Sequence, residues 1–347
     1  MDKAKGISSA PKWYVACRSG DLNPGPFRSV VAGVPLALFR AGGRAGALLD
    51  RCPHRNAPLS GGSVRGDELE CAYHGWRFTG DGRCAFAAGI NVDRITRACH
   101  ASSFPVVEQQ GFVWVSSSEG NPPRHPPFVF ELMSKPGYAS DVAVLEAEGS
   151  LQAVAENALD VPHTMYLHGG LFRRKGGRNV EKEVEIRNYG DRVEAEYFGE
   201  ERPSGLAGRF LAPGGGMVRH VDRFILPSIT EVDYRLGDKT HVNVSVAMTP
   251  ISEFLTRLYA VVSFRLPVPA LFIKPVLRLL FLKVFNQDAT ILARQSANIR
   301  LFGGEQFATI EADTLGSHIA RLLKEADTGP EIRVLKEPIV RRVRIVL

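Results

Sequence analysis

Two cysteines and two histidines stand in pairs near the start of the chain. Cys52 and His54 form a C-x-H pair, and Cys71 and His74 form a C-x-x-H pair, with sixteen residues between the pairs. Each segment offers one thiolate and one imidazole. Such a set can bind a [2Fe–2S] cluster, with two Cys on one iron and two His on the other, or a structural zinc ion. The alternation of Cys and His within each segment favours the iron–sulfur cluster.

A second group of possible metal ligands lies in the stretch ENALDVPHTMYLHGG. On a helix, Asp160 and His163 would share a face, whereas His168 would lie off that face if the helix were straight. Pro162 removes a backbone donor and favours a kink that brings both imidazoles to one metal. Two His and one carboxylate form the facial triad of non-haem Fe(II) oxygenases, which leaves positions open for O₂ and substrate.

The spacing of these residues resembles that of the Rieske non-haem iron oxygenases. The stretch from Cys52 to Trp76 resembles their Rieske domain, and D-x-x-H-x-x-x-x-H resembles their catalytic motif. Rieske proteins of respiratory complexes carry an extra cysteine in each loop, and neither loop has one here. The resemblance extends from about Trp13 to the C-terminal region and points to the homo-oligomeric monooxygenase and demethylase branch.

The resemblance also implies roles for individual residues. His163 and His168 are expected to be iron ligands. Asp160 is expected to connect the mononuclear site with a Rieske histidine of a neighbouring subunit, as a group that hydrogen-bonds a ligating imidazole. The family implies a head-to-tail homotrimer, in which the cluster of one subunit faces the iron of the next.

Three further carboxylate or amide residues belong to this expectation. The family places its third iron ligand far downstream on a helix, and FNQDATILARQ offers Asp288; the alternative is a carboxylate in the first turn of that helix. Asn157 is expected to support the site. Glu156 is left open between a role in the motif and a surface carboxylate. The remaining histidines lack metal spacing and are expected to be structural or exposed.

The elements that must position these groups change in character along the chain. Residues 12–118 contain short apolar runs separated by Gly, Pro, Asp and Asn, which predicts an all-β domain for the cluster. Residues 119–142 begin with a Pro-rich stretch and are expected to be a linker or wrapped loop. Residues 143–347 are expected to form an α+β catalytic domain, an antiparallel sheet flanked by helices.

Within the second domain the periodicity predicts a helix over Leu151–His168 that ends at Gly169 and Gly170. The pattern then alternates as in antiparallel strands from Val180 to Met248. Later elements are one more strand and three helices, expected at 257–266, before Phe285, at 286–298 and at 314–326.

One apolar segment requires a test for membrane insertion. Leu266–Val284 is strongly apolar but contains Lys274, Arg278 and Lys283. A membrane-spanning helix needs about 20 apolar residues with few charges. We therefore expect a buried helix that forms a core or pocket wall, and contact with a membrane is the less favoured alternative.

Composition narrows the function classes. The 347-residue chain has a net charge of +6 with scattered cations, which argues against nucleic acid and allows an acidic redox partner. Its five cysteines are an odd count and a poor basis for disulfides, and no signal peptide is visible, so a reducing cytoplasm is expected. Cys17, Cys84 and Cys99 are expected to be small buried residues without a metal role.

These observations combine into one expected function. Because no dinucleotide-binding loop or P-loop is evident, electrons must come from a ferredoxin or a reductase, with NAD(P)H as the distant donor. The expected reaction is hydroxylation of a hydrophobic alicyclic or aromatic compound, and oxidative O- or N-demethylation is the close alternative. Two other classes are a Rieske electron carrier without oxygenase activity and a membrane-associated structural protein.

Overall fold

The computed structural model describes residues 10–22, 25–169, 180–199, 218–237, 240–328 and 334–346. Contacts between residues divide the chain into two units. One unit comprises residues 1–129 with 249–252, and the other comprises 130–248 with 253–347. The boundaries that the sequence predicts for the segments 12–118, 119–142 and 143–347 remain predictions. We describe each unit by itself.

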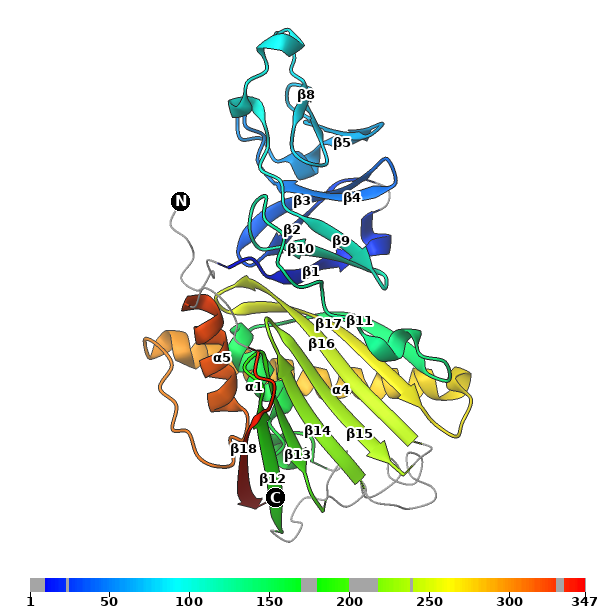
Figure 1. Cartoon of the computed structure of the whole chain (residues 1–347), viewed down its shortest axis with the longest axis vertical. Coiled ribbons are helices and arrows are strands. Elements are labelled where there is room, and N and C mark those ends of the chain that lie inside the picture. Colours follow the sequence, from blue (N-terminus) through cyan, green and yellow to red (C-terminus); the bar gives the residue numbers. More distant parts are fainter. Residues whose placement is uncertain are drawn as a thin grey trace. The chain divides into compact units, whose positions relative to one another are not determined.

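Short strands build the first unit, in three sheets with the orders β1-β10-β9, β2-β3-β4 and β5-β6-β7-β8 (Figure 1). The described helices of this unit are single 3₁₀ turns. The strands are β1 (Trp13–Arg18), β2 (Phe27–Val31), β3 (Val34–Ala41), β4 (Arg44–Leu49), β5 (Ser63–Arg65), β6 (Glu68–Glu70), β7 (Arg77–Thr79), β8 (Cys84–Phe86), β9 (Val106–Gln109) and β10 (Phe112–Ser116). The all-β expectation for this part of the chain is confirmed.

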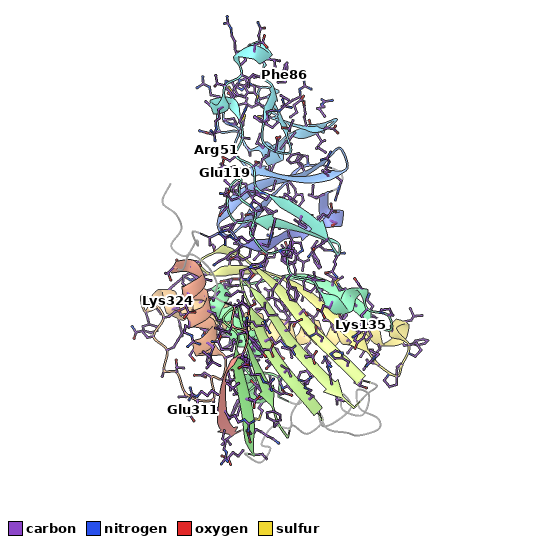
Figure 2. The ribbon with its side chains drawn as sticks, in the orientation of Figure 1. Arg51, Phe86, Glu119, Lys135, Glu311 and Lys324 are labelled. Atoms are coloured by element: carbon purple, nitrogen blue, oxygen red, sulfur yellow. The ribbon has the colours of Figure 1, made fainter. Side chains whose placement is uncertain are left out.

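A compact apolar cluster anchors the loops that carry the paired cysteines. Cys52 and Cys71 are buried in this cluster together with Leu59, Leu69 and Phe78. The loops therefore start from fixed positions in the core, and their following residues extend toward the surface, where Phe86 of β8 is also exposed (Figure 2).

The loop that follows Cys52 depends on one glycine. A Cβ atom on Gly62 would lie only 2.1 Å from the carbonyl oxygen of Glu70, the last residue of β6. Only glycine permits so close an approach of two backbones. Because Glu70 directly precedes Cys71, this contact holds the two cysteine loops next to each other.

An eight-stranded sheet forms the centre of the second unit, in the order β11-β17-β16-β15-β14-β13-β12-β18 (Figure 1). The neighbours β12 to β16 pair antiparallel, as do β11 with β17 and β12 with β18. The strands are β11 (Ala139–Ala147), β12 (Glu181–Asn188), β13 (Arg192–Tyr197), β14 (Val218–Ile225), β15 (Ile229–Leu236), β16 (Thr240–Ser252), β17 (Leu255–Arg265) and β18 (Ile339–Val346).

Helices cover one face of this sheet. They are α1 (Leu151–Leu159), α2 (His163–Leu167), α4 (Ala270–Leu301) and α5 (Gly316–Thr328). Val154 of α1, Leu292 of α4 and Ile319 of α5 belong to one apolar cluster with Phe224 and Val246 of the sheet. Each such buried side chain contributes roughly 1.5–3 kcal/mol of stability. The predicted fold class, α+β with an antiparallel sheet flanked by helices, is confirmed.

The opposite face of the sheet carries ion pairs on β12, β13, β14 and β18. Arg187 and Arg219 both pair with Glu196 at 2.8 Å, and Arg342 pairs with Glu185 at the same distance. Opposite charges on neighbouring strands stabilise the pairing of these strands. This alternation between an apolar and a charged face explains why the strands could be recognised in the sequence.

Some expected elements differ in the structure. The two helices expected on either side of Phe285 form a single helix, α4, which contains Pro275 in its second turn and there lacks one backbone hydrogen-bond donor. β18 was not predicted, although Arg342, Val343, Arg344 and Ile345 alternate between charged and apolar residues. Gly169 follows α2, but Gly170 lies outside the described residues.

The expectation that Leu266–Val284 forms a buried wall is only half right. Phe281 and Phe285 pack against the core, but Leu271 and Leu279 on the outer side of α4 are exposed. Leucine and phenylalanine occur on both sides of this helix, so its apolar residues alone do not indicate which side is buried. Within the described part of the chain, no helix has the length and apolar character that crossing a bilayer requires.

Candidate metal centres

The two cysteine loops of the first unit have the same backbone hydrogen bonds. The N–H of Cys52 donates to the carbonyl of Ala57, and the N–H of Cys71 donates to the carbonyl of Trp76. The carbonyl of each cysteine accepts from the residue four positions on, Asn56 in one loop and Gly75 in the other. Both of these residues have positive φ, 60° and 66°. The loops are therefore two copies of one turn.

These turns bring the two imidazoles together. The ring centroids of His54 and His74 are 4.5 Å apart, and the indole of Trp76 stacks on His54 at 4.6 Å. Burial raises the pKa of the Cys52 thiol to about 11, and the neighbouring Cys71 adds to this rise. Two buried thiols side by side favour a bound cation, since a metal replaces the thiol protons.

The second centre lies where α1 ends and α2 begins. Ser150 caps α1 by accepting a hydrogen bond from the N–H of Ala153. α1 ends at Leu159, since Asp160 has extended backbone angles, and α2 starts at His163 immediately after Pro162. The kink that the sequence predicts is thus a complete break between two helices. Because of it, the imidazoles of His163 and His168 turn to one point.

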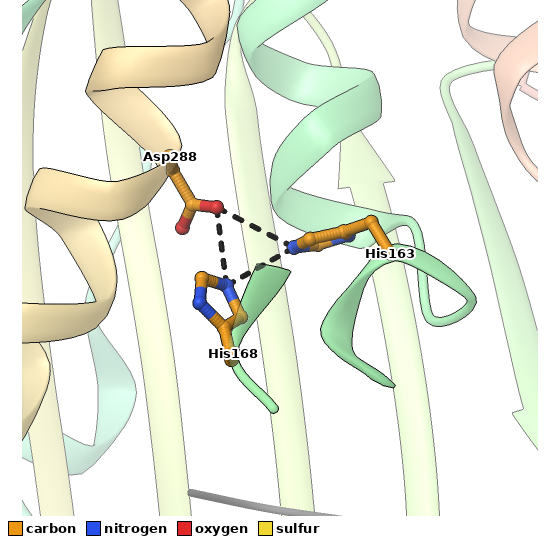
Figure 3. A group of neighbouring side chains, drawn as sticks. All are labelled: His163, His168 and Asp288. Carbon is orange, nitrogen blue, oxygen red and sulfur yellow. Dashed lines mark hydrogen bonds and ion pairs between the residues drawn. The ribbon is translucent and has the colours of Figure 1, made fainter. Parts of the chain in front are cut away.

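His163, His168 and Asp288 form a triangle of metal-binding atoms (Figure 3). The Nε2 atoms of the two histidines are 3.2 Å apart. The Asp288 Oδ1 atom lies 3.4 Å from Nε2 of His163 and 3.1 Å from Nε2 of His168. Asp288 comes from the middle of α4 rather than from its first turn. Its placement therefore does not depend on the positive end of a helix.

The second nitrogen of each histidine faces a polar side chain. Nδ1 of His168 lies 2.9 Å from Oε1 of Gln287. Because an amide oxygen only accepts, His168 carries its proton on Nδ1 and presents the lone pair of Nε2 to the centre. Nδ1 of His163 lies 3.5 Å from Oδ2 of Asp160, an ion-pair distance. Gln287 was missed in the sequence, where only its position next to Asp288 could have pointed to it.

The charges of this triangle favour a bound cation. Burial alone would lower the pKa of His163, but the carboxylates of Asp160 and Asp288 outweigh it and raise that pKa to about 9. Burial alone would raise the pKa of Asp288, but the two histidines hold it below its usual value. A proton or a metal ion can neutralise the carboxylate here.

Buried atoms at both centres fit the metals that the resemblance implies. The Oδ1 atom of Asp288, which points into the triangle, and Nδ1 of His54 in the cysteine loops are buried and form no hydrogen bond with another described residue. Such atoms cost free energy unless another partner is bound. The ligand types also agree, with Cys₂His₂ for a Rieske cluster and two His with one carboxylate for mononuclear iron.

A hollow of about 1100 Å³ opens beside the second centre. Asn157, Asp160 and His163 lie in its wall together with Glu156. Asn157 is therefore near the triangle but is not one of its corners. Burial raises the pKa of Glu156, which accepts a hydrogen bond from Gln152 at 2.9 Å. The hollow also contains Tyr166, which is 81% exposed.

Two other histidines are buried on the sheet rather than in a metal centre. His220 pairs with Asp222 at 2.8 Å and stacks between the rings of Tyr197 and Tyr234. His241 pairs with Asp233 at 2.8 Å. Each histidine is held by a carboxylate, which agrees with the structural role expected for them.

Two families match the chain. The Rieske [2Fe-2S] domain matches residues 12–105, and the vanillate O-demethylase oxygenase C-terminal domain matches residues 147–327. The expected ligands of the first metal centre lie within the first match, and those of the second metal centre lie within the second match.

Matches to curated relatives cover about half of the chain. The chain is 32% identical to the oxygenase component of dicamba O-demethylase from Stenotrophomonas maltophilia over 176 residues, which are 50% of this chain and 51% of the relative. It is 36% identical to 4beta-methylsterol monooxygenase from Methylococcus capsulatus over 166 residues, 45% of this chain and 44% of the relative. The chain thus spans about half the length of the curated relatives it matches.

Solved structures match over nearly the whole length. The crystal structure of dicamba monooxygenase bound to 3,6 dichlorosalicylic acid has a TM-score of 0.76, with 24% sequence identity. The match covers 91% of this chain and 96% of that chain. At this identity the likeness establishes the fold.

Proposed function

Because the chain belongs to the Rieske oxygenase family, in the branch of the vanillate and dicamba demethylases, we propose that it is an oxygenase acting on a lipophilic small molecule. The triangle of His163, His168 and Asp288 carries this proposal. A Rieske protein that only transfers electrons needs no second metal centre. In such a protein, nothing would require two histidines and one aspartate to converge on one point.

The residues divide the chemistry between them. When bound, the Rieske cluster supplies single electrons and the mononuclear iron activates O₂. Cys52, His54, Cys71 and His74 would hold the cluster. His163, His168 and Asp288 would hold the iron from one side, which leaves the other side for O₂ and substrate. Gln287 fixes the proton of His168 on Nδ1, so that Nε2 can bind the metal.

The proposed overall reaction is R–H + O₂ + 2e⁻ + 2H⁺ → R–OH + H₂O. A C–H bond breaks and a C–O bond forms, while the second oxygen atom leaves as water. The two electrons come from a reduced partner protein, a ferredoxin or a ferredoxin reductase with NAD(P)H as the distant donor. In this scheme Asp160, which lines the hollow together with His163 and lies 3.5 Å from its Nδ1, would connect this histidine with a Rieske histidine of a neighbouring subunit.

Demethylation is a second candidate with its own support. The family that matches residues 147–327 is described by a vanillate O-demethylase, and the relative from Stenotrophomonas maltophilia is a dicamba O-demethylase. If the attacked C–H bond belongs to a methyl group on oxygen or nitrogen, the product of the same reaction loses formaldehyde. The metal ligands are the same for both reactions, so the products must distinguish them.

We further propose that the chain works as a homotrimer. The hollow beside Asp160 is open and contains the exposed Tyr166. The cluster loops expose Tyr73, which packs on His74 at 3.8 Å. We expect the hollow next to the iron of one copy to receive the exposed Tyr73 next to the cluster of another copy, and head-to-tail contacts form a closed ring when the rotation between copies permits it. A purified active enzyme with the mass of one chain would contradict the trimer.

The test of the proposed reaction is a single turnover without any partner. The purified protein is reduced anaerobically, freed of excess reductant, and mixed with ¹⁸O₂ and one compound of a lipophilic panel. We expect one compound to accelerate reoxidation of the cluster and to gain one ¹⁸O atom, or to lose a methyl group with release of formaldehyde. A matched Asp288→Ala variant should keep the cluster and form no product. If the wild-type cluster cycles without any product across a wide panel, the chain is an electron carrier.

A further inference from the structure

The first half of α4 has an exposed apolar face. Leu271, Phe272 and Leu279 are 80%, 70% and 71% exposed, and Pro275 and Val276 are exposed between them. At about 100° per residue these five positions lie within one sector of the helix. Soluble proteins rarely leave so many large apolar side chains together in water unless the surface binds a partner.

Cations surround the beginning of this face. Lys274 and Arg278 belong to the same turns of α4 and pair with Asp141 of β11 at 3.4 and 2.8 Å. Lys135 and Arg265 lie over the ring of Tyr138, just before β11, with their charges 5.6 and 5.2 Å from its centre (Figure 2 labels Lys135).

One more cation, Lys283, is exposed one turn beyond Leu279. Lys and Arg side chains thus lie along the border of the apolar face, and two of them share the carboxylate of Asp141. An apolar helix face bordered by Lys and Arg is the composition of helices that lie in the interface of an anionic bilayer.

A second hollow continues this face toward the iron ligands. It has a volume of about 620 Å³ and begins at Leu279, the last residue of the apolar face. Leu167 and Leu282 line it, and so does Gln287, which contacts His168 at 2.9 Å. An apolar compound that leaves a bilayer at Leu279 would meet a hollow lined by leucines and by polar side chains, among them Asn286 and Thr290, that reaches Gln287 beside the metal centre.

We propose that the apolar face of α4, formed by Leu271, Phe272, Pro275, Val276 and Leu279, docks on the surface of an anionic lipid bilayer and takes lipophilic substrate from it. The helix lies on the membrane and does not cross it. The role as a substrate entrance rests on the proposed oxygenase function, whereas the binding of lipid does not. This surface replaces the buried wall that the sequence predicts.

The test uses the full-length holoprotein and sedimentation with vesicles of phosphatidylcholine, with or without phosphatidylglycerol. We expect wild-type protein to sediment with the anionic vesicles and roughly tenfold less protein to do so in the double variant Leu271→Glu, Phe272→Glu, since two charges must enter the interface. Leu301→Glu, on an exposed leucine at the other end of α4, is the matched control and should bind like wild type. Neutral vesicles should bind more weakly.

Two results would overturn this proposal. Either the wild-type protein does not bind anionic vesicles, or the double variant binds them as well as wild type. If wild type does not bind and the double variant has a lower mass than wild type in sedimentation velocity, a second copy of the chain covers the face. Because no turnover is measured, failure of lipid binding leaves the oxygenase reaction intact. Normal lipid binding without product in the single-turnover assay would reject the reaction alone.

Discussion

Gln287 and His168 form the contact that orients one metal-binding histidine. The amide oxygen lies 2.9 Å from Nδ1 of His168, and the next residue of the same helix, Asp288, lies 3.1 Å from Nε2 of that histidine. One turn of α4 thus contacts both nitrogens of a single imidazole. This arrangement couples the position of the carboxylate to the orientation of the ring.

Replacement of Gln287 by Leu should weaken iron binding. The variant loses the acceptor for the Nδ1 proton, and loss of such an outer contact typically lowers metal affinity about 10- to 100-fold. Gln287→Glu keeps an acceptor and should retain most of the affinity. Competition for Fe(II) with a chelator, with cluster absorbance as the internal reference, measures the effect. Equal affinity of wild type and Gln287→Leu would show that the contact does not orient His168.

Replacement of Asp160 by Asn should separate iron binding from electron transfer. Asp160 is not a corner of the triangle, so the variant should keep its iron. It should slow reoxidation of the reduced cluster in the single-turnover assay by about 100-fold, the loss of roughly 3 kcal/mol of barrier reduction. Glu156→Gln, on the preceding helix α1 and in the same hollow, is the control. If both variants behave like wild type, Asp160 has no part in the transfer.

Replacement of Cys52 by Ser should remove the cluster and leave the mononuclear iron. Cys52 and Cys71 are buried side by side, and both thiolates are needed for one iron of the cluster. The visible absorbance of the cluster should disappear, and iron per chain should fall from about three atoms to about one. Cys99→Ser, in the same unit but with no expected metal role, should change neither value. Retention of the absorbance in Cys52→Ser would remove Cys52 from the ligand set.

The pair of Asp233 and His241 should make stability depend on acid pH. Burial alone would raise the pKa of Asp233, but His241 and Arg235 outweigh it and lower the pKa to about 2. A carboxylate with a depressed pKa stabilises the fold above its usual pKa near 3.8, and this contribution disappears as the pH falls from about 4 to about 2. It amounts to on the order of 2 kcal/mol.

Asp233→Asn should therefore lower the free energy of unfolding by about that amount at neutral pH. The difference between variant and wild type should shrink as the pH approaches 3. Denaturant unfolding at several pH values measures it, and the comparison at each pH cancels any loss of cluster that both proteins share. A difference that is the same at pH 3 and pH 7 would contradict the ionic pairing.

The ligands of both metal centres were accessible from the sequence because they are short-range motifs. Cys52 and His54 lie two residues apart, and Asp160, His163 and His168 lie within one short stretch. Asp288 could be proposed only through the family resemblance, since no local pattern connects it with residues more than a hundred positions earlier. The fold class followed from the alternating strands, whose two faces differ in polarity.

Other features depend on contacts that no local pattern records. Gln287 is a common helix residue, and only the tertiary structure shows its oxygen next to His168. The exposed side of α4 was not predicted because Leu271 and Phe281 are equally apolar in the sequence, yet one faces water and the other packs against the core. β18 is far in the sequence from its partner β12, and this pairing is visible only in the tertiary structure.

The most direct test of the central claim examines the iron held by His163, His168 and Asp288. Nitric oxide added to the anaerobic Fe(II) protein should give the high-spin iron–nitrosyl signal in electron paramagnetic resonance. Asp288→Ala and His163→Ala should lose this signal while the reduced Rieske cluster keeps its own spectrum. If the nitrosyl signal survives in both variants, the iron is bound elsewhere and the proposed centre is wrong.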